Sequence, residues 1–154
     1  MTYWDRKLIR DQLDVRFKNL RNLAEKSIPE SGWIRVIREA LGMSARQLGQ
    51  RVGLSQPRIS RLEIAESEGD LKLSTLKKIA EGMNMKFVYG FVPESSLEEM
   101  VQDQAKKIAL KRMTKVNHTM RLEEQELSNE DKRKAFEDLT QKILINEPKD
   151  FWDL

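Results

Sequence analysis

The stretch SARQLGQRVGLSQPRISRLE, residues 44–63, contains the starts of two helices within twenty residues. Ser44 is a good N-cap for the segment ARQLGQRV, and Gly53 is a good residue to end that helix. Ser55 then caps a second helix, and Pro57 fits its first turn because the amides there have no partner inside the helix. The stretch therefore predicts two short helices that meet at a three-residue turn.

The second of these helices has two different faces. Ile59 and Leu62 are three residues apart, so their side chains point the same way and can be buried against the rest of the domain. On the opposite face, glutamine can bond adenine and arginine can bond guanine with two hydrogen bonds each, and proline suits a thymine methyl group. Arg58 and Ser55 lie closer to where the phosphates of a bound duplex would run. We predict DNA binding by Arg46, Ser55, Gln56, Pro57, Arg58, Ser60 and Arg61.

Positive charge is concentrated around this stretch. Residues 33–62 hold six arginines, no lysine and a single acid, Glu39. A basic face of this kind attracts nucleic acid because bound phosphates release their counterions. Basic stretches are also common on ordinary solvated helices, so the arginines alone leave both interpretations open. The six are Arg35, Arg38, Arg46, Arg51, Arg58 and Arg61.

Residues 34–83 resemble a helix-turn-helix of the lambda Cro and repressor superfamily. The pattern S-A-R-Q-L-x-Q-R-V-G-L-S-Q-P-x-I-S-R-L-E, at residues 44–63, is similar to the second and third helices of that superfamily position by position. The resemblance implies a DNA-binding domain with a lambda repressor-like, five-helix-type core. We therefore expect a mainly all-α fold, with one short β-strand in the core and further helices on both sides of it.

The chain of 154 residues, 39% hydrophobic and 34% charged, is large enough for one small domain with helical extensions. We expect an N-terminal helical extension at 1–29, because SIPESG at 27–32 breaks the first helical pattern. The DNA-binding domain is expected at 30–93, and a helical region for dimer or partner binding at 94–154. The first helix is expected to bury Ile9, Leu13, Phe17, Leu20 and Ala24.

The hydrophobic pattern changes its period after the helix TLKKIAEGM, which we expect Ser74 to cap. In MKFVYGFV, residues 85–92, apolar residues alternate between two faces, which predicts a strand that ends at Pro93. The sequence offers no second convincing strand. We therefore hypothesise that this strand pairs with the same strand of a second subunit in a two-fold dimer. The alternative is an extended arm that packs on its own domain.

Two long helices are predicted in the C-terminal third. Ser95 or Ser96 can cap the first helix. Glu98 and Glu99 are available for a capping box there, and Ser128 begins the second helix. Their apolar stripes favour packing on the protein's own core, on a dimer mate or on a partner protein. The stripes are Leu97, Val101, Ala105, Ile108 and Val116 in the first helix, and Phe136, Leu139 and Ile143 in the second.

The residues that many enzymes need are scarce. The sequence has no cysteine and one histidine, His118, so disulfides are excluded and a zinc site or a catalytic thiol has no support. It also has no glycine-rich phosphate loop. We therefore expect neither enzyme activity nor a cofactor. The first residues contain no apolar run that could form a signal peptide or a membrane span, so we expect a cytoplasmic protein.

Beside the helix-turn-helix, the sequence contains G-W-I-R at 32–35, V-P-x-x-S-L-E-E-M at 92–100, H-T-M at 118–120 and F-W-D near the end. With these pieces, the whole chain resembles the family called mobile mystery protein A. Members of that family are typically encoded beside a Fic-domain protein, which transfers AMP from ATP to target hydroxyls. The resemblance implies an antitoxin that binds its Fic-domain toxin and represses their shared promoter.

The partners implied by this resemblance are double-stranded DNA with a palindromic operator, a Fic-domain toxin and a second copy of the chain. The alternative is a stand-alone or phage-type repressor with no toxin partner. Known Fic inhibitors resemble a helix with Ser/Thr-x-x-x-Glu followed by Gly or Asn. Here Thr119 to Glu123 is followed by Glu124, and Ser95 to Glu99 is followed by a methionine, so the mode of inhibition stays open.

Overall fold

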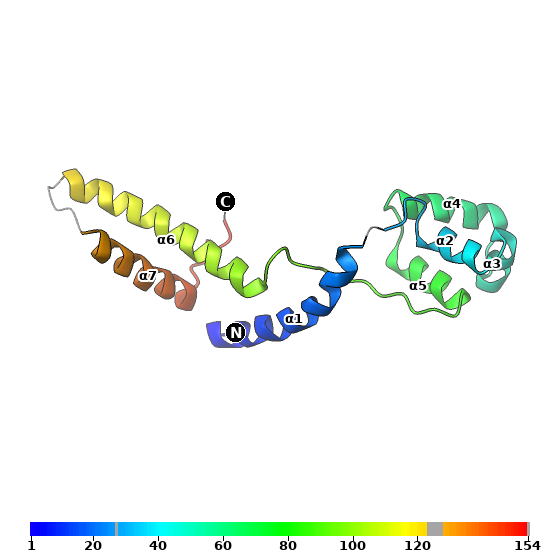
Figure 1. Cartoon of the computed structure of the whole chain (residues 1–154), viewed down its shortest axis with the longest axis horizontal. Coiled ribbons are helices and arrows are strands. Elements are labelled where there is room, and N and C mark those ends of the chain that lie inside the picture. Colours follow the sequence, from blue (N-terminus) through cyan, green and yellow to red (C-terminus); the bar gives the residue numbers. More distant parts are fainter. Residues whose placement is uncertain (27, 123–127, 154) are drawn as a thin grey trace. The chain divides into compact units, whose positions relative to one another are not determined.

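The computed structural model describes residues 1–26, 28–122 and 128–153 (Figure 1). These residues form seven helices and no strand, which confirms the prediction of a mainly all-α fold. The chain divides into two compact units. We call residues Asn22–Gly90 the helix-turn-helix unit, and Met1–Arg21 together with Phe91–Leu154 the helical unit. The N-terminal and C-terminal helical segments, expected as separate regions, therefore belong to one unit.

The helix-turn-helix unit contains four helices around a small apolar core. Leu48 and Ile59 lie at its centre, and neither side chain is accessible to solvent. Each helix is too short to be stable alone in water, so its stability depends on the buried residues of one face, which pack against the other helices. The helices are α2 (Trp33–Ala40), α3 (Ala45–Val52), α4 (Gln56–Ser67) and α5 (Leu73–Gly82). The remaining core residues are Ile34, Val52, Leu62, Ile79 and Met83.

After α5 the chain continues as an extended segment in place of the predicted strand and a fifth core helix. Residues 86–90 form no backbone–backbone hydrogen bond with other described residues, which contain no strand that could pair with them. The strand is therefore not shown in the single chain. The alternation itself is present, since the rings of Phe87 and Tyr89 are stacked on one side, 6.0 Å apart and 18° from parallel.

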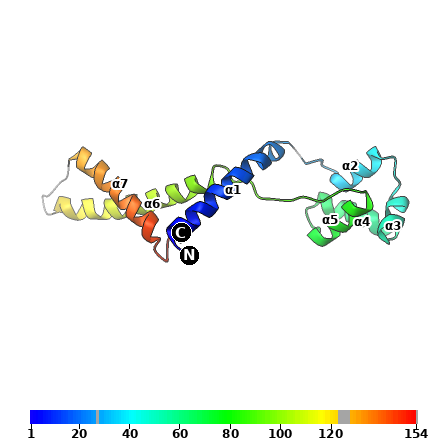
Figure 2. The same cartoon turned by 90° about the horizontal axis from the view of Figure 1, so that it is seen from below.

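The helical unit contains α1 (Tyr3–Ala24), α6 (Leu97–Leu122) and α7 (Asn129–Asn146). Helices α6 and α7 lie side by side in both views (Figures 1 and 2). The tail after α7 also packs, since Phe151 is 4% exposed and its carbonyl oxygen accepts a 2.6 Å hydrogen bond from Gln104 Nε2. The core residues of this unit are Tyr3, Val101, Ala105, Ala109, Ile143, Leu144 and Phe151.

The predicted apolar stripes of this unit are partly wrong. On α1, Ile9 is 41% exposed and Ala24 is exposed, whereas Tyr3 and Arg10 are buried. The buried face is shifted because Arg10 forms an ion pair with α6, which the apolar pattern alone did not indicate. On α6, Val116 is 52% exposed, whereas Ala109, which the prediction did not include, is buried.

The helix starts follow the predictions except at one position. In α6, the Ser96 hydroxyl accepts a hydrogen bond from Glu99 N at 3.0 Å, and Glu99 Oε2 accepts one from Ser96 N at 3.3 Å. Ser128 caps α7 by accepting from Asp131 N. The prediction for Ser74 is wrong, because α5 begins at Leu73 and its N-cap residue is Lys72. None of the described helices is long and apolar enough to cross a membrane.

Candidate nucleic-acid interface

The first helix of the pair, α3, is fixed at its start by side chains close in sequence. Ser44 Oγ accepts a 3.1 Å hydrogen bond from Gln47 N, and Gln47 Oε1 accepts a 2.7 Å hydrogen bond from Ser44 N. This capping box satisfies two backbone donors that an open helix end leaves unpaired. The predicted cap at Ser44 is confirmed, and the contribution of Gln47 is an addition to it.

The turn between α3 and α4 is tight and depends on glycine. Gly53 adopts the left-handed conformation with φ of 71°, as predicted for the residue that ends α3. The Leu54 N–H then donates a 2.8 Å hydrogen bond to the Gly49 carbonyl oxygen. A Cβ on Gly49 would lie 2.3 Å from the Leu54 carbonyl oxygen, so a larger residue would push the turn away from α3. Gly49 therefore sets how closely the two helices approach.

The second helix, α4, is held from its buried side. Ile59 is 0% and Leu62 is 6% exposed, which confirms that these residues form the inner face. Next to them, Glu63 accepts two hydrogen bonds from Arg38 of α2, from Nε at 2.6 Å and from Nη2 at 3.2 Å. A third donor of Arg38, Nη1, bonds the Met43 carbonyl oxygen at 2.8 Å. The hydrogen bond to Glu63 raises the pKa of the Arg38 guanidinium.

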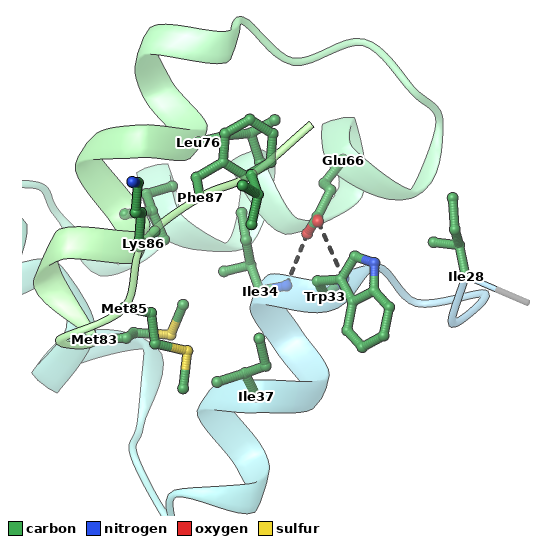
Figure 3. A pocket seen from close by; sticks show the side chains of 13 residues that line it. Ile28, Trp33, Ile34, Ile37, Glu66, Leu76, Met83, Met85, Lys86 and Phe87 are labelled. Atoms are coloured by element: carbon green, nitrogen blue, oxygen red, sulfur yellow. Dashed lines mark hydrogen bonds between the residues drawn. The ribbon is translucent and has the colours of Figure 1, made fainter. Parts of the chain in front are cut away.

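The far end of α4 also supports α2. Glu66 accepts hydrogen bonds from the first amides of α2, from Trp33 N at 3.1 Å and from Ile34 N at 2.9 Å (Figure 3). Gly32, with φ of 80°, lets the chain pass close to this carboxylate, since a Cβ there would lie 2.7 Å from Glu66 Oε2. Together with the pair formed by Glu63, these contacts fix the orientation of α4 against α2.

The six arginines predicted as a basic face fall into two groups. The Arg38 side chain is 12% exposed and is paired with Glu63, so its assignment to an exposed basic face is wrong. Arg35 pairs with Glu39 at 2.9 Å, and Arg51 Nε donates to the Gly82 carbonyl oxygen at 2.5 Å. Among the described residues, the other three are exposed and have no ion-pair partner. These are Arg46, Arg58 and Arg61.

All seven residues predicted to bind DNA are exposed. Arg46 lies in the first turn of α3, and the others lie at the cap or in the first half of α4. Ser55 Oγ accepts a hydrogen bond from Arg58 N at 3.3 Å, which confirms its role as the cap of α4. The structure thus brings Ser55, Gln56, Pro57, Arg58, Ser60 and Arg61 together along about two turns of one helix.

Lys72 is a candidate phosphate contact that the sequence analysis did not select. It lines an open groove of about 550 Å³ together with Arg58 and Arg61, beside the loop between α4 and α5. Asp70 is in the same groove and reduces its positive charge. In the sequence, Lys72 follows an acid-containing loop, and nothing in its local pattern indicates that the loop returns it to the α4 arginines.

Residues 34–89 match a family model described as helix-turn-helix. This segment is therefore similar to helix-turn-helix domains. The match supports the lambda Cro and repressor superfamily for this part of the chain, with DNA binding and transcription regulation as its function. No curated protein and no solved structure matches the chain significantly.

Proposed function

We propose that this protein is a sequence-specific transcriptional repressor that binds a palindromic operator as a homodimer in the cytoplasm. The observation that carries the proposal is the outer face of α4. Its polar side chains are exposed and its arginines Arg58 and Arg61 have no ion-pair partner among the described residues, while Ile59 and Leu62 hold the inner face. A helix presented in this way can enter the major groove with its N-terminal half toward the bases.

The residues of this face divide by the part of DNA that they reach. Gln56 and Arg61 are placed to read bases, because each can form two hydrogen bonds with one purine. Arg46, Arg58 and Lys72 supply positive charge for phosphates, which positions the helix without reading sequence. Holding α4 through the buried pair of Glu63 keeps these groups in one geometry before DNA arrives, so less order has to be gained on binding.

We further propose that the protein is the antitoxin of a Fic-domain toxin and represses the operon that encodes both. The resemblance to mobile mystery protein A supports this role. The helical unit offers a surface for such a partner, since it is not needed to read DNA and carries large exposed apolar side chains. Among these are Trp4 at 67%, Leu8 at 60% and Trp152 at 59% exposure. We propose no enzyme activity and no cofactor for the chain itself.

The structure bears on one of the two Fic-inhibitor patterns. Glu99 Oε2 bonds Ser96 N in the cap of α6, so an inhibitory role for Glu99 would require it to leave that cap. The other pattern ends at Glu123, which lies outside the described residues. The proposed neutralisation therefore rests on binding of the toxin by the helical unit, without assigning an inhibitory glutamate.

DNA recognition is tested by selecting binding sites from random DNA with the full-length protein. We expect a two-fold symmetric sequence. Gln56→Ala should remove the preference at one base pair of each half-site, and Gln50→Ala, an exposed glutamine on α3, should leave the selected sequence unchanged. Recovery of no preferred sequence by the wild-type protein would count against a sequence-specific repressor.

The toxin partner is tested by purifying the tagged full-length protein from its host and identifying bound proteins by mass spectrometry. We expect a Fic-domain protein in a stoichiometric amount. Recovery of only the protein itself, under conditions that preserve weak complexes, would favour the stand-alone repressor. The sequence of the neighbouring reading frame can be checked first. A Fic signature of the form H-P-F-x-x-G-N-G-R in that frame would support the toxin pair.

A further inference from the structure

The long helix α6 carries opposite charges on its two parts. Residues 97–103 hold three acids and no basic residue, whereas residues 104–122 hold six basic residues and no acid. Basic residues near the end of a helix favour its dipole, but that effect is confined to the last turn. Lys107 lies about four turns before Leu122, so the helix dipole does not account for the basic part. The six are Lys106, Lys107, Lys111, Arg112, Lys115 and Arg121.

Three of these basic residues have no ion-pair partner within the described ranges. Lys107, Lys111 and Arg112 are exposed, and none of them takes part in a salt bridge with another described residue. Lys106, by contrast, pairs with Asp103 at 3.7 Å. Helix α7 packs along one side of α6 (Figures 1 and 2), and none of its described acids pairs with these three residues. We call Lys107, Lys111 and Arg112 the α6 basic patch.

The α6 basic patch does not stabilise the helix that carries it. Lys107 and Lys111 are four residues apart, so their side chains are neighbours on the helix surface. Like charges at this spacing repel each other and destabilise a helix. A ligand with negative charges, bound along this surface, removes that repulsion. The patch therefore fits a ligand that carries several negative charges in a row.

We propose that the α6 basic patch binds the phosphate backbone of duplex DNA, as a second contact in addition to the helix-turn-helix unit. The inference rests on the DNA binding proposed above and extends it to the helical unit. DNA fits the patch better than an acidic protein does, because the buried centres of protein interfaces are poor in lysine and rich in aromatic residues. Lysine is a compact charge on a flexible stem, which suits phosphates.

The spacing of the two lysines agrees with a phosphate backbone. Lys107 and Lys111 are about 6 Å apart along the helix axis, at about 1.5 Å per residue. Phosphates of one DNA strand follow each other at about 3.4 Å along the duplex axis, so lysines one helical turn apart can reach alternate phosphates. Contacts of this kind do not read bases. They strengthen binding to every DNA sequence and make binding more sensitive to salt.

The test is a full-length triple variant with Lys107→Gln, Lys111→Gln and Arg112→Gln. Glutamine is a good helix former, so α6 should remain folded. The affinity for a duplex much longer than one operator is measured at several salt concentrations. We expect the slope of log affinity against log salt to become shallower by about 2 to 3, because each phosphate contact contributes about 0.9. The preference for one DNA sequence over another should stay the same.

The matched control is a triple variant with Lys18→Gln, Lys142→Gln and Lys149→Gln. These lysines are also exposed and lie outside α6, so the control lowers the net charge by the same amount. Its salt slope should be nearly that of the wild-type protein. An equal change of slope in the two triple variants would overturn the inference, because DNA binding would then depend on net charge and not on the α6 basic patch.

The outcomes separate this inference from the proposed function. An unchanged slope in the α6 triple variant, with a shallower slope in Arg58→Ala, overturns the inference and leaves the recognition helix in place. A wild-type protein without sequence preference contradicts the sequence-specific repressor, whereas a shallower slope in the α6 triple variant still supports the patch. If the α6 triple variant kept its slope and lost a bound Fic-domain protein, the patch would be a protein contact, which also overturns the inference.

Discussion

The two units of this protein use the same chemistry at very different distances along the chain. In the helix-turn-helix unit, the ion pair of Arg38 and Glu63 joins residues 25 positions apart. In the helical unit, the ion pair of Arg10 and Glu98 joins residues 88 positions apart. The helix starts differ in the same way. Ser44 and Gln47 cap α3 from within three residues, whereas α6 takes part of its capping from α1.

This difference explains why function could be inferred for one unit and not for the other. A recognition helix needs a cap, an inner stripe and an outer face within one short segment, so its purpose is visible in consecutive residues. A bundle that binds a partner needs only a surface, which is assembled from α1, α6, α7 and the tail. No short run of consecutive residues in the helical unit therefore indicates which protein partner it binds.

The largest effect is expected from breaking the buried ion pair of the helix-turn-helix unit. Glu63→Ala removes the nearest carboxylate of Arg38, whose side chain is 12% exposed, and leaves it the more distant Glu39 carboxylate at 3.8 Å. We expect the free energy of unfolding of this unit to fall by about 3–5 kcal/mol. Amide hydrogen exchange in α2 to α5, measured by mass spectrometry, reports this loss without interference from the helical unit.

The control for this variant is Glu68→Ala, an exposed carboxylate just after the same helix. It should change exchange rates little, because removing an exposed charge costs little. The double variant Arg38→Met with Glu63→Leu should recover most of the lost stability, since a well-packed apolar pair can replace a buried ion pair. Comparable exchange in Glu63→Ala and Glu68→Ala would show that the buried pair does not hold α4.

The next effect concerns DNA rather than folding. Arg61→Ala should weaken binding to the preferred operator by about 1–3 kcal/mol and relax the preference at one base pair. Arg58→Ala should instead weaken binding to all sequences and lower the salt dependence by the equivalent of about one phosphate contact. Fluorescence anisotropy with operator and scrambled DNA, at several salt concentrations, separates the two.

Arg35→Ala is the matched control for these arginines, because Arg35 is exposed on α2 and pairs with Glu39. It should leave both the affinity and the preference nearly unchanged. If Arg61→Ala also left affinity and preference unchanged, the assignment of this face of α4 to base recognition would be wrong. The helix-turn-helix unit would then have to contact DNA through another surface.

A smaller effect is expected where α1 caps α6. The Asp14 carboxylate accepts hydrogen bonds from Leu97 N at 2.8 Å and Glu98 N at 3.3 Å. Asp14→Ala should cost about 0.5–2 kcal/mol, the usual range for losing a cap, although this cap lies 83 positions away. Hydrogen exchange at the first amides of α6 measures the loss.

Asp11→Ala is the control on the same helix, because Asp11 pairs with Lys7 of its own helix on an exposed surface. That substitution should cost about 0.5 kcal/mol or less and leave the exchange of α6 unchanged. Equal protection of the α6 amides in Asp14→Ala and in the wild-type protein would mean that Ser96 and Glu99 cap this helix without help. The contrast between local and distant capping would then disappear.

Much of the helix-turn-helix unit could be predicted because each feature depends on near neighbours. The caps Ser44 and Ser55, the left-handed Gly53 and the inner pair of α4 are all determined by residues within a few positions. The ion pair of Arg38 and its low side-chain exposure could not be predicted in this way, because its partner Glu63 lies on another helix. Charge counts treat every arginine alike, and only packing separates the buried one from the exposed ones.

The strand and the α1 stripe show the same limit. Residues 85–92 have the alternation of a strand, but a strand also needs a partner, and the single chain supplies none among its described residues. On α1, an apolar stripe that runs from Ile9 to Ala24 was expected. The buried face includes Arg10 instead, because its carboxylate partners are distant in the sequence, with Glu98 on α6 and Glu147 just after α7.

The smallest predicted effect concerns Ser74 and has an informative sign. If Ser74 were the cap of α5, Ser74→Ala would cost about 1 kcal/mol, as expected for Ser44→Ala at the true cap of α3. In the structure Ser74 is exposed inside the first turn of α5, where alanine favours the helix more than serine by about 0.5 kcal/mol. Ser74→Ala should therefore leave the unit unchanged or slightly more stable, while Ser44→Ala destabilises it. Denaturant unfolding of the two variants, side by side, measures the sign of the change in the free energy of unfolding. If Ser74→Ala lowered this free energy as much as Ser44→Ala does, Ser74 would be the cap of α5 after all.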